Sequence, residues 1–211
     1  MNFIILEHYI TVNLSNMKLL KGGALIALGL MTLNSTIAQK VKLIEGDLSA
    51  LKNEKSINTE FIYDKMKVGK FDDESEYVNK KKEEYNKKEA GKGDTWATQW
   101  VDDREEKFEP QFNELFEKTS MMSITPKSKY TLIYKTTFTE PGFNIGVMRK
   151  NATIDGEAWI VETANKNKVI AKISVAKAPG RMFGGFDFDT GERIQEAYAM
   201  AGRAVAKMIV K

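Results

Sequence analysis

Apolar and polar positions alternate along three stretches in the second half of the chain. Lys129–Glu140, Ala152–Glu162 and Lys168–Ala176 each carry an apolar residue at about every second position, which is the period of a half-buried strand. Asn165 to Asn167 supplies turn residues between the last two stretches. The pattern therefore predicts three strands, of which the last two form an antiparallel hairpin.

The period changes at the carboxyl end, where Asp189–Lys211 predicts a helix. Its apolar residues recur at steps of three and four and so share one face; they are Ile194, Ala197, Tyr198, Ala201, Val205, Met208 and Ile209. Asp189 or Thr190 is expected to cap its first turn. Because an amphipathic helix needs an apolar surface on which to bury its stripe, we expect it to cover the sheet formed by the preceding strands.

The first half of the chain adds two predicted strands and a helical insertion at about 72–119. Val41–Leu51 and Ser56–Val68 have the strand period, and Asp72–Glu89 is a polar helix whose lysines and glutamates form a solvated face. The predicted fold class is therefore α+β: a mixed, largely antiparallel sheet of about five strands, packed by the carboxyl-terminal helix.

An aromatic stripe at helical spacing follows the glycine-containing break at 91–94. Its members are Trp96, Trp100, Phe108, Phe112, Leu115 and Phe116. Pro110 interrupts the stripe and predicts a kink or the start of a second helix. Such stripes usually belong to a hydrophobic core, although they can also stack sugars or bases. We expect Trp96 to be the exception, exposed for binding, because it lies beside the break.

The first 38 residues have the three parts of a secretory signal. Lys18–Lys21 is a basic start, Gly22–Leu33 is an apolar run too short for a membrane span, and Thr36 and Ala38 are the small residues that a signal peptidase recognises. We expect synthesis to start at Met17 and cleavage to follow Ala38, which leaves a single domain, 39–211, with no transmembrane segment. The alternative interpretation is a short amino-terminal anchor.

The composition of the chain excludes several kinds of binding and catalytic site. The 32 basic and 29 acidic residues give a net charge of +3, too balanced to favour nucleic acid. The chain has no cysteine, so disulfides, thiolate chemistry and a lipidated amino terminus are excluded, and the single histidine, His8, lies in the predicted leader. The mature domain therefore lacks the residues of the usual zinc sites and nucleophilic triads, and no cofactor or metal is expected.

Three acidic groups offer weaker candidates. Asp155 and Glu157 lie two apart on one strand face and can form a carboxylate pair, although a solvated strand face is the simpler interpretation. The stretch 187–192 superficially resembles a calcium loop, but helix capping explains its acidic residues more simply. The acidic run at 102–106, which contains Arg104, is interpreted as the solvated face of a helix.

The glycine-rich stretch between the hairpin and the last helix supplies the remaining binding candidates. Phe183, Phe186 and Phe188 lie close together there beside Arg181, and exposed phenylalanines in a loop usually dock on something. Docking on the domain itself and docking on a partner are both open. The candidate contact residues are therefore Phe183, Phe186 and Arg181, with Trp96.

Two segments also carry a family resemblance. Asn151–Val175 followed by Phe188–Lys211 resembles the carboxyl-terminal half of exported bacterial proteins with the TolB amino-terminal-like fold, a group that includes the curli-secretion lipoprotein. Val68–Asn86 and Gly91–Phe116 are similar to uncharacterised exported proteins of Bacteroidetes. The resemblance implies an α/β sandwich with an accessory role in the cell envelope. It carries over no functional residue, and the missing lipidated cysteine sets this chain apart from the lipoproteins.

These observations support three functional hypotheses. The first is a non-enzymatic exported protein, in the periplasm or associated with the outer membrane, that binds an envelope protein or a glycan. The second is a carboxylate-dependent enzyme acting on glycans, with Trp96 or Trp100 as a sugar platform. The third is a periplasmic domain that binds a small ligand between the closing helix and the sheet.

Overall fold

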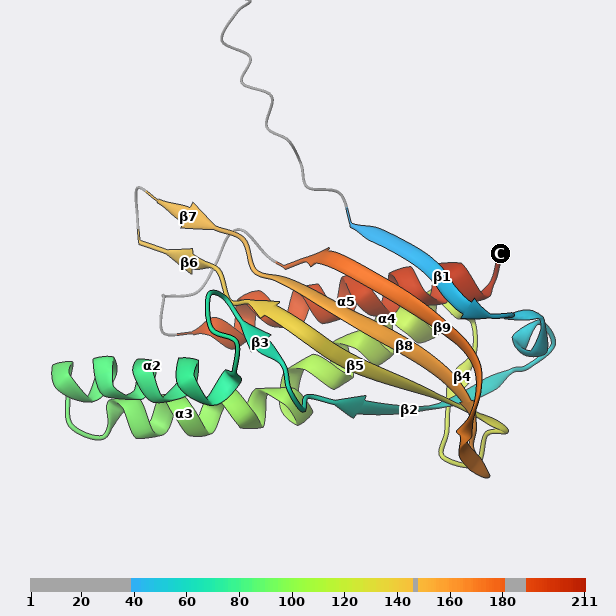
Figure 1. Cartoon of the computed structure of the whole chain (residues 1–211), viewed down its shortest axis with the longest axis horizontal. Helices are drawn as coiled ribbons and strands as arrows, with labels where there is room; N and C mark the ends of the chain where they lie inside the picture. Colours follow the sequence, from blue (N-terminus) through green and yellow to red (C-terminus); the bar gives the residue numbers. More distant parts are fainter. Residues whose placement is uncertain (1–38, 146–147, 181–188) are drawn as a thin grey trace, which may run out of the picture. The chain divides into compact units, whose positions relative to one another are not determined.

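The structure is a computed structural model that describes residues 39–145, 148–180 and 189–211 (Figure 1). Its strands are β1 (Lys40–Gly46), β2 (Ser56–Ile62), β3 (Lys67–Val68), β4 (Ser123–Ile124), β5 (Tyr130–Glu140), β6 (Phe143–Asn144), β7 (Arg149–Lys150), β8 (Thr153–Glu162) and β9 (Asn165–Pro179). Its helical elements are η3 (Ser49–Leu51), α2 (Glu74–Lys88), α3 (Lys92–Asp103), a π turn η4 (Arg104–Phe108), α4 (Glu109–Ser120) and α5 (Thr190–Ile209). This content confirms the predicted α+β class.

The main sheet has the order β1-β9-β8-β5-β2-β4, with the short β3 beside β5. The pairs β1–β9, β9–β8 and β8–β5 are antiparallel, whereas β2 runs parallel to β5. The parallel pair follows from the chain path, because α2, α3 and α4 form the crossover between these two strands. Five long strands with two short additions agree with the predicted sheet of about five.

The hairpin of β8 and β9 is confirmed, but its turn lies earlier than predicted. Ile160 pairs with Ala171, and Glu162 pairs with Asn165. The turn is therefore made by Thr163 and Ala164, and Asn165 already belongs to β9. Register shifts near this end absorb the difference.

A β-bulge in β5 overturns one part of the predicted alternation. The register shifts between Thr136, opposite Gly156, and Phe138, opposite Asp155. Thr139 consequently faces the core, with 2% of its surface exposed, while Phe138 is only partly buried; Thr136, which is 0% exposed, lies before the shift and keeps the core-facing phase of Tyr134. A bulge inserts one residue on one strand, so every later side chain changes face.

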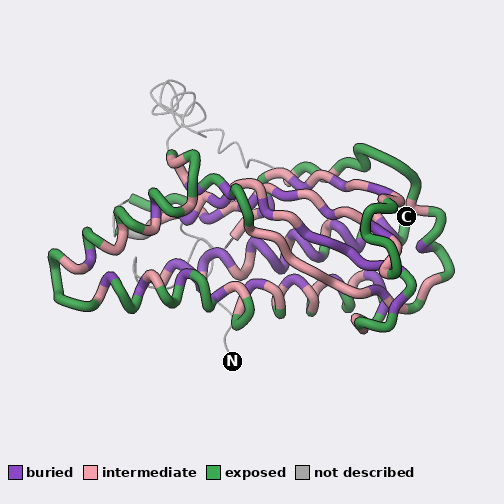
Figure 2. The backbone as a smooth tube through the Cα atoms, turned by 60° about the horizontal axis from the view of Figure 1, so that its bottom comes forward, coloured by how far each residue is buried: buried purple, intermediate pink, exposed green. Residues whose placement is uncertain are grey.

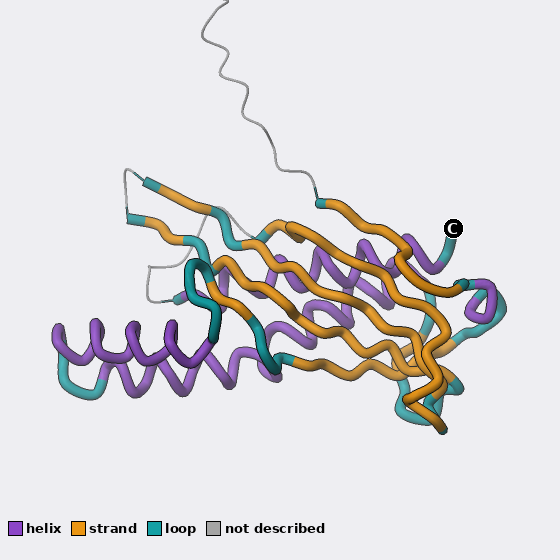
Figure 3. Tube along the Cα trace, in the orientation of Figure 1, coloured by secondary structure: helices purple, strands orange, loops and turns teal. Residues whose placement is uncertain are grey.

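Helices α4 and α5 pack against one face of the sheet, as Figure 3 shows. The predicted stripe of α5 is buried: Ala197, Ala201 and Val205 are fully covered. Gly202 lets α5 approach α4 closely, since a Cβ at this position would lie 2.2 Å from the carbonyl oxygen of Phe112. Burial along the backbone, drawn in Figure 2, alternates on the strands, and exposed residues gather at the far end of the α2–α3 hairpin.

The start of α5 differs from the capping that the sequence predicted. Asp189 occupies the N-cap position, but its side chain makes no capping hydrogen bond. The buried guanidinium of Arg193 holds this end instead: its Nε donates to the carbonyl of Pro141 at 3.2 Å, and Nη1 donates to that of Asp189 at 3.4 Å. The helix end is thus tied to the end of β5 by an arginine that the pattern did not mark.

Helices α2 and α3 form a hairpin that extends beyond the ends of the strands (Figure 1). Asp73 caps α2 by accepting a hydrogen bond from the backbone N–H of Ser75 at 2.7 Å. Tyr77 and Tyr85 of α2 are buried against α3. The helix α3 begins at Lys92, and Asp94 lies in its first turn.

Pro110 lies in the first turn of α4, as predicted. The π turn of Arg104–Phe108 joins this helix to α3 without a break in the helical path. Within the described ranges, none of the helices combines the length and the apolar character needed to cross a bilayer.

Candidate site: the α3–α5 cleft

The π turn η4 lies between two cavities. Arg104, at its start, lines a pocket beside α2, while Lys107, one turn further, lines a cleft between α3 and the start of α5. We call the first the α2 pocket and the second the α3–α5 cleft. Because π turns occur frequently at functional sites, both cavities are candidates.

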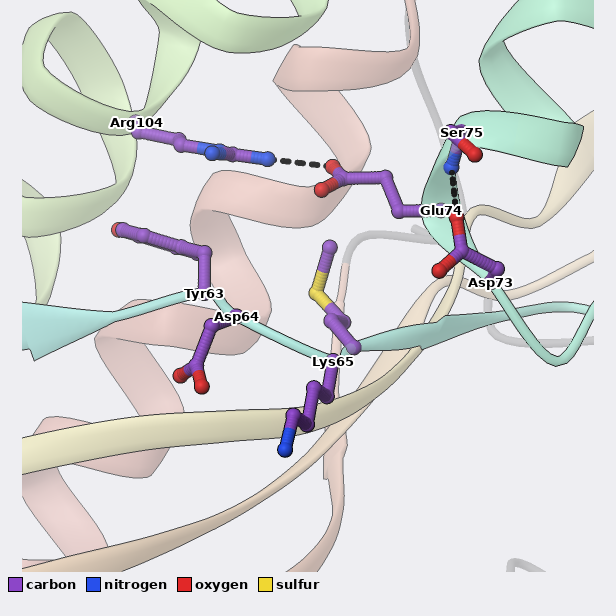
Figure 4. A pocket seen from close by; sticks show the side chains of 8 residues that line it. Tyr63, Asp64, Lys65, Asp73, Glu74, Ser75 and Arg104 are labelled. Atoms are coloured by element: carbon purple, nitrogen blue, oxygen red, sulfur yellow. Dashed lines mark hydrogen bonds and ion pairs between the residues drawn. The ribbon is translucent and has the colours of Figure 1, made fainter.

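The α2 pocket has a volume of about 420 Å³ and is drawn in Figure 4. Glu74 spans its roof: one carboxylate oxygen accepts from Trp100 Nε1 at 2.5 Å and also binds the Arg104 guanidinium. Arg104 lies over the ring of Tyr63, 4.5 Å from its centroid. The arginine that fell within a supposedly solvated acidic run is therefore held on two sides.

Behind this pocket the Tyr63 hydroxyl donates to Glu109 at 3.2 Å. Burial, together with the nearby Tyr198 and Glu109, raises the pKa of Tyr63 far above its ordinary value. Burial also raises the pKa of Glu109, against the opposing effect of the Tyr63 hydrogen bond. The charged and phenolic groups at this wall are thus paired with one another and support the junction of β2 with the helices.

The α3–α5 cleft is larger, with a volume of about 690 Å³, within the range of small-molecule sites. One wall comes from α3, the floor from the π turn and the other wall from the first turn of α5. Its lining includes the side chains of Trp96, Gln99, Trp100, Asp103, Lys107 and Asp189.

Lys107 is the centre of an ion cluster in this cleft. Its ammonium lies 3.1 Å from an Asp103 oxygen, 3.2 Å from a Glu192 oxygen and 3.8 Å from an Asp189 oxygen. The Asp189 and Glu192 carboxylates, which the sequence assigned to helix capping, are directed to this lysine. One ammonium therefore links the π turn to the start of α5.

The pKa values reflect the unequal surroundings of the pair. Burial raises the pKa of Asp103, in spite of the Lys107 hydrogen bond. Burial alone would lower the pKa of Lys107, but the hydrogen bonds and charges of Asp103, Glu192 and Asp189 raise it. Both pKa values are raised. For Asp103, burial outweighs its one cationic partner, whereas for Lys107 the three anionic partners outweigh burial.

Gly191 is required by the close approach of α5 to Asp103. A Cβ on this glycine would lie 1.8 Å from Asp103 Oδ2, and Asp103 is only 8% exposed. Any side chain at position 191 would therefore displace the buried carboxyl and the cleft wall with it.

The expectation that Trp96 stands apart from the core is wrong. Its side chain is 2% exposed, because its ring packs against Tyr77, Tyr85 and Trp100 at centroid distances of 5.5–5.8 Å. Trp100, which is 6% exposed, is buried in the same cluster. Neither ring presents an open face to a ligand, so a sugar platform of the predicted kind is not formed. Both residues nevertheless line the cleft.

Trp96 also differs from Trp100 in its hydrogen bonding. The Trp100 N–H is engaged by Glu74, whereas the Trp96 N–H donates to none of the residues that the structure describes. The Trp96 ring lines the cleft, so its N–H is a donor that a ligand in the cleft could engage.

The other predicted candidates do not join this site. Arg181, Phe183 and Phe186 lie outside the described residues. Asp155 and Glu157 lie on the sheet face opposite the core, where Asp155 accepts the Lys177 backbone N–H at 2.6 Å and Glu157 accepts the N–H of the Trp159 indole at 2.8 Å. Each carboxylate is thus engaged locally.

Asp103 and Lys107 are the site residues that sequence reasoning missed. The acidic run at 102–106 was interpreted as solvated, which is wrong for Asp103. Its spacing carried a signal: Asp103 follows Trp96 by seven residues and Trp100 by three, so it continues the buried stripe. Lys107 is one turn further along the same face.

Comparison with known proteins finds only distant structural similarity. No family model matches the sequence, and no curated protein matches it. Two of the similar solved structures are the PelC dodecamer of Paraburkholderia phytofirmans and a variant of it, each with 9% sequence identity and a TM-score of 0.34. The match covers 77% of this chain and 96–97% of theirs. At this level of similarity the neighbours do not bear on the function of this chain.

Proposed function

We propose that this chain is a non-enzymatic exported accessory protein that binds another component of the cell envelope through the α3–α5 cleft. The observation that carries the proposal is the combination in the cleft of a Trp96 donor without a partner among the described residues and an ion cluster in which three carboxylates surround Lys107. These groups offer both a hydrogen-bond donor and hydrogen-bond acceptors to a ligand. Export is supported by the leader pattern of residues 17–38, and the accessory role by the resemblance to TolB-like proteins.

A matched pair of substitutions on α3 tests the use of the cleft. Gln99 and Thr98 are adjacent and exposed, but of the two only Gln99 lines the cleft. Gln99→Trp places a large side chain at its rim, whereas Thr98→Trp makes the same change beside it. The full chain and both variants are used to capture partners from envelope extracts. We expect the retained components to be lost with Gln99→Trp alone; equal retention by both variants would refute the role of the cleft.

A second candidate function, a carboxylate-dependent enzyme on glycans, rests on Asp103. A buried carboxyl with a raised pKa in a cleft is a feature of catalytic acids, and Asp189 provides a second carboxylate. The Lys107 ammonium, however, contacts both groups. The test is glycan turnover by the full chain and by Asp103→Asn; turnover that the substitution abolishes would favour the enzyme over the binding protein.

A further inference from the structure

The charges of the α3–α5 cleft disfavour an anionic ligand, because three carboxylates surround one ammonium, and Lys107 already occupies the position that a cation would take. An anion would approach the carboxylates of Asp103, Asp189 and Glu192, and a cation would compete with Lys107, which already contacts all three. The other lysine at the rim, Lys92, forms an ion pair with Glu89 at 2.8 Å. A charged ligand would therefore have to break existing ion pairs before it gained its own.

What the cleft does offer is a mixture of donors and acceptors. The Trp96 N–H is a donor without a partner among the described residues, and the Gln99 amide, which both donates and accepts, makes no hydrogen bond within the same part of the chain. The carboxylate oxygens of Asp103 and Asp189 retain lone pairs beyond those that face Lys107. A ligand hydroxyl matches this arrangement, because it donates and accepts at once.

The apolar part of the wall fits the same class of ligand. Trp96 and Trp100 present only a small part of their rings, because their faces are covered within the aromatic cluster. They can therefore contact the C–H groups of a ligand at the edge of the ring but cannot stack it. Recognition would depend chiefly on hydrogen bonds, with a small apolar contribution.

From this arrangement we propose that the α3–α5 cleft binds a neutral, hydroxyl-rich ligand, a saccharide unit that is either free or at the end of a polymer. This inference rests on the proposed binding function and names its ligand class. The Trp96 N–H donates to a ligand hydroxyl, the Gln99 amide binds a second hydroxyl at the rim, and the Asp103 and Asp189 carboxylates accept from others.

The test measures binding to the full chain by saturation-transfer NMR and tryptophan fluorescence. The probes are glucose, N-acetylglucosamine, maltose and dextran as neutral ligands, glucose 6-phosphate as an anion and spermidine as a cation. We expect one or more neutral probes to bind more tightly than either charged probe. Binding of the free sugars identifies a small-molecule source, and binding of dextran alone identifies a polymer.

Variants decide whether the cleft is the site. Trp96→Phe keeps an aromatic ring in the core and removes the N–H, and Gln99→Leu removes the exposed amide without touching the core. Each is expected to weaken neutral binding by about threefold to tenfold, the loss of one hydrogen bond. Thr98→Leu is the control and should bind as the parent chain does.

The outcomes separate this inference from the function that it deepens. Preferred binding of glucose 6-phosphate or spermidine would overturn the ligand class, as would unchanged sugar binding in Gln99→Leu and Trp96→Phe. Failure of every probe to bind would overturn it too. The proposed accessory function fails by a different result, partner capture that Gln99→Trp leaves intact.

Discussion

Two buried tyrosines on facing elements provide a matched test of the core. Tyr198 on α5 and Tyr134 on β5 are 1% and 0% exposed, and their rings lie 6.2 Å apart. The Tyr198 hydroxyl hydrogen-bonds with the buried hydroxyl of Thr136 at 2.7 Å. The Tyr134 hydroxyl has no partner among the described residues. Substituting phenylalanine for each therefore removes the same atom from two different polar environments.

The expected effects have different signs. Tyr198→Phe loses the hydrogen bond and leaves the Thr136 hydroxyl buried without a partner, which costs about 1–3 kcal/mol. Tyr134→Phe removes a buried hydroxyl that pays a desolvation penalty without return, so stability should be unchanged or rise by up to about 1 kcal/mol. Because both rings are retained, the packing against Phe108 and Phe112 contributes little to the difference.

The assay is urea unfolding of the full chain and the two variants, followed by circular dichroism. In a domain of this size each kcal/mol corresponds to a shift of roughly 2–4 °C in the melting temperature, so thermal unfolding provides a second measurement. Thr136→Val is made in the full chain and in Tyr198→Phe. This double-mutant cycle should give a coupling free energy of about 1 kcal/mol between Thr136 and Tyr198. Equal destabilisation by the two substitutions would refute the hydrogen-bond assignment, and so would a larger loss with Tyr134→Phe.

Three further predictions concern the cleft and the end of α4. Gly191→Ala should lower the free energy of unfolding in urea by about 1–3 kcal/mol, because its Cβ would lie 1.8 Å from Asp103 Oδ2. Unchanged stability would mean that the end of α3 and the start of α5 are not in contact. Met121→Gly should raise the free energy of unfolding by about 1 kcal/mol in the same assay, since this 82% exposed residue has a left-handed φ of 60°. A lower free energy of unfolding would show that the Met121 side chain makes stabilising contacts. Burial raises the pKa of Asp103 above 3.8, so the folded state holds this proton more tightly than the unfolded chain, and its contribution to the unfolding free energy falls as the pH rises through the window above 3.8. Asp103→Asn should remove that fall in the window above pH 3.8, and an identical pH slope in the variant would contradict the assignment.

The periodicity of the chain was sufficient for the architecture. The α5 stripe, the β8–β9 hairpin and the position of Pro110 were predicted because each depends on spacing within a short segment. The β5 bulge could not be read in this way, because it arises from how β5 pairs with β8 and inverts Phe138 and the residues beyond it.

The candidate site depended on information that no single segment contains. Lys107 meets Asp189 and Glu192 only because α5 returns across the π turn, more than 80 positions along the chain. Asp103 was assigned to a solvated run because its neighbours in sequence are charged. Its spacing of three residues from the buried Trp100 nevertheless places it on the buried face of the helix. Charge runs obscure such a residue unless each position is tested against the helical period.

The π turn at Arg104–Phe108 also fixes the direction in which the α2–α3 hairpin points. A π turn contains one residue more than the α-helix it interrupts, and one residue is about 100° of rotation about a helix axis. Deleting a single residue there would let α3 and α4 fuse into one regular helix and would swing the hairpin by about a quarter of a revolution. Both helices would survive such a deletion, but Asp103 would no longer meet Gly191. The length of this stretch, rather than its composition, aligns the two halves of the molecule.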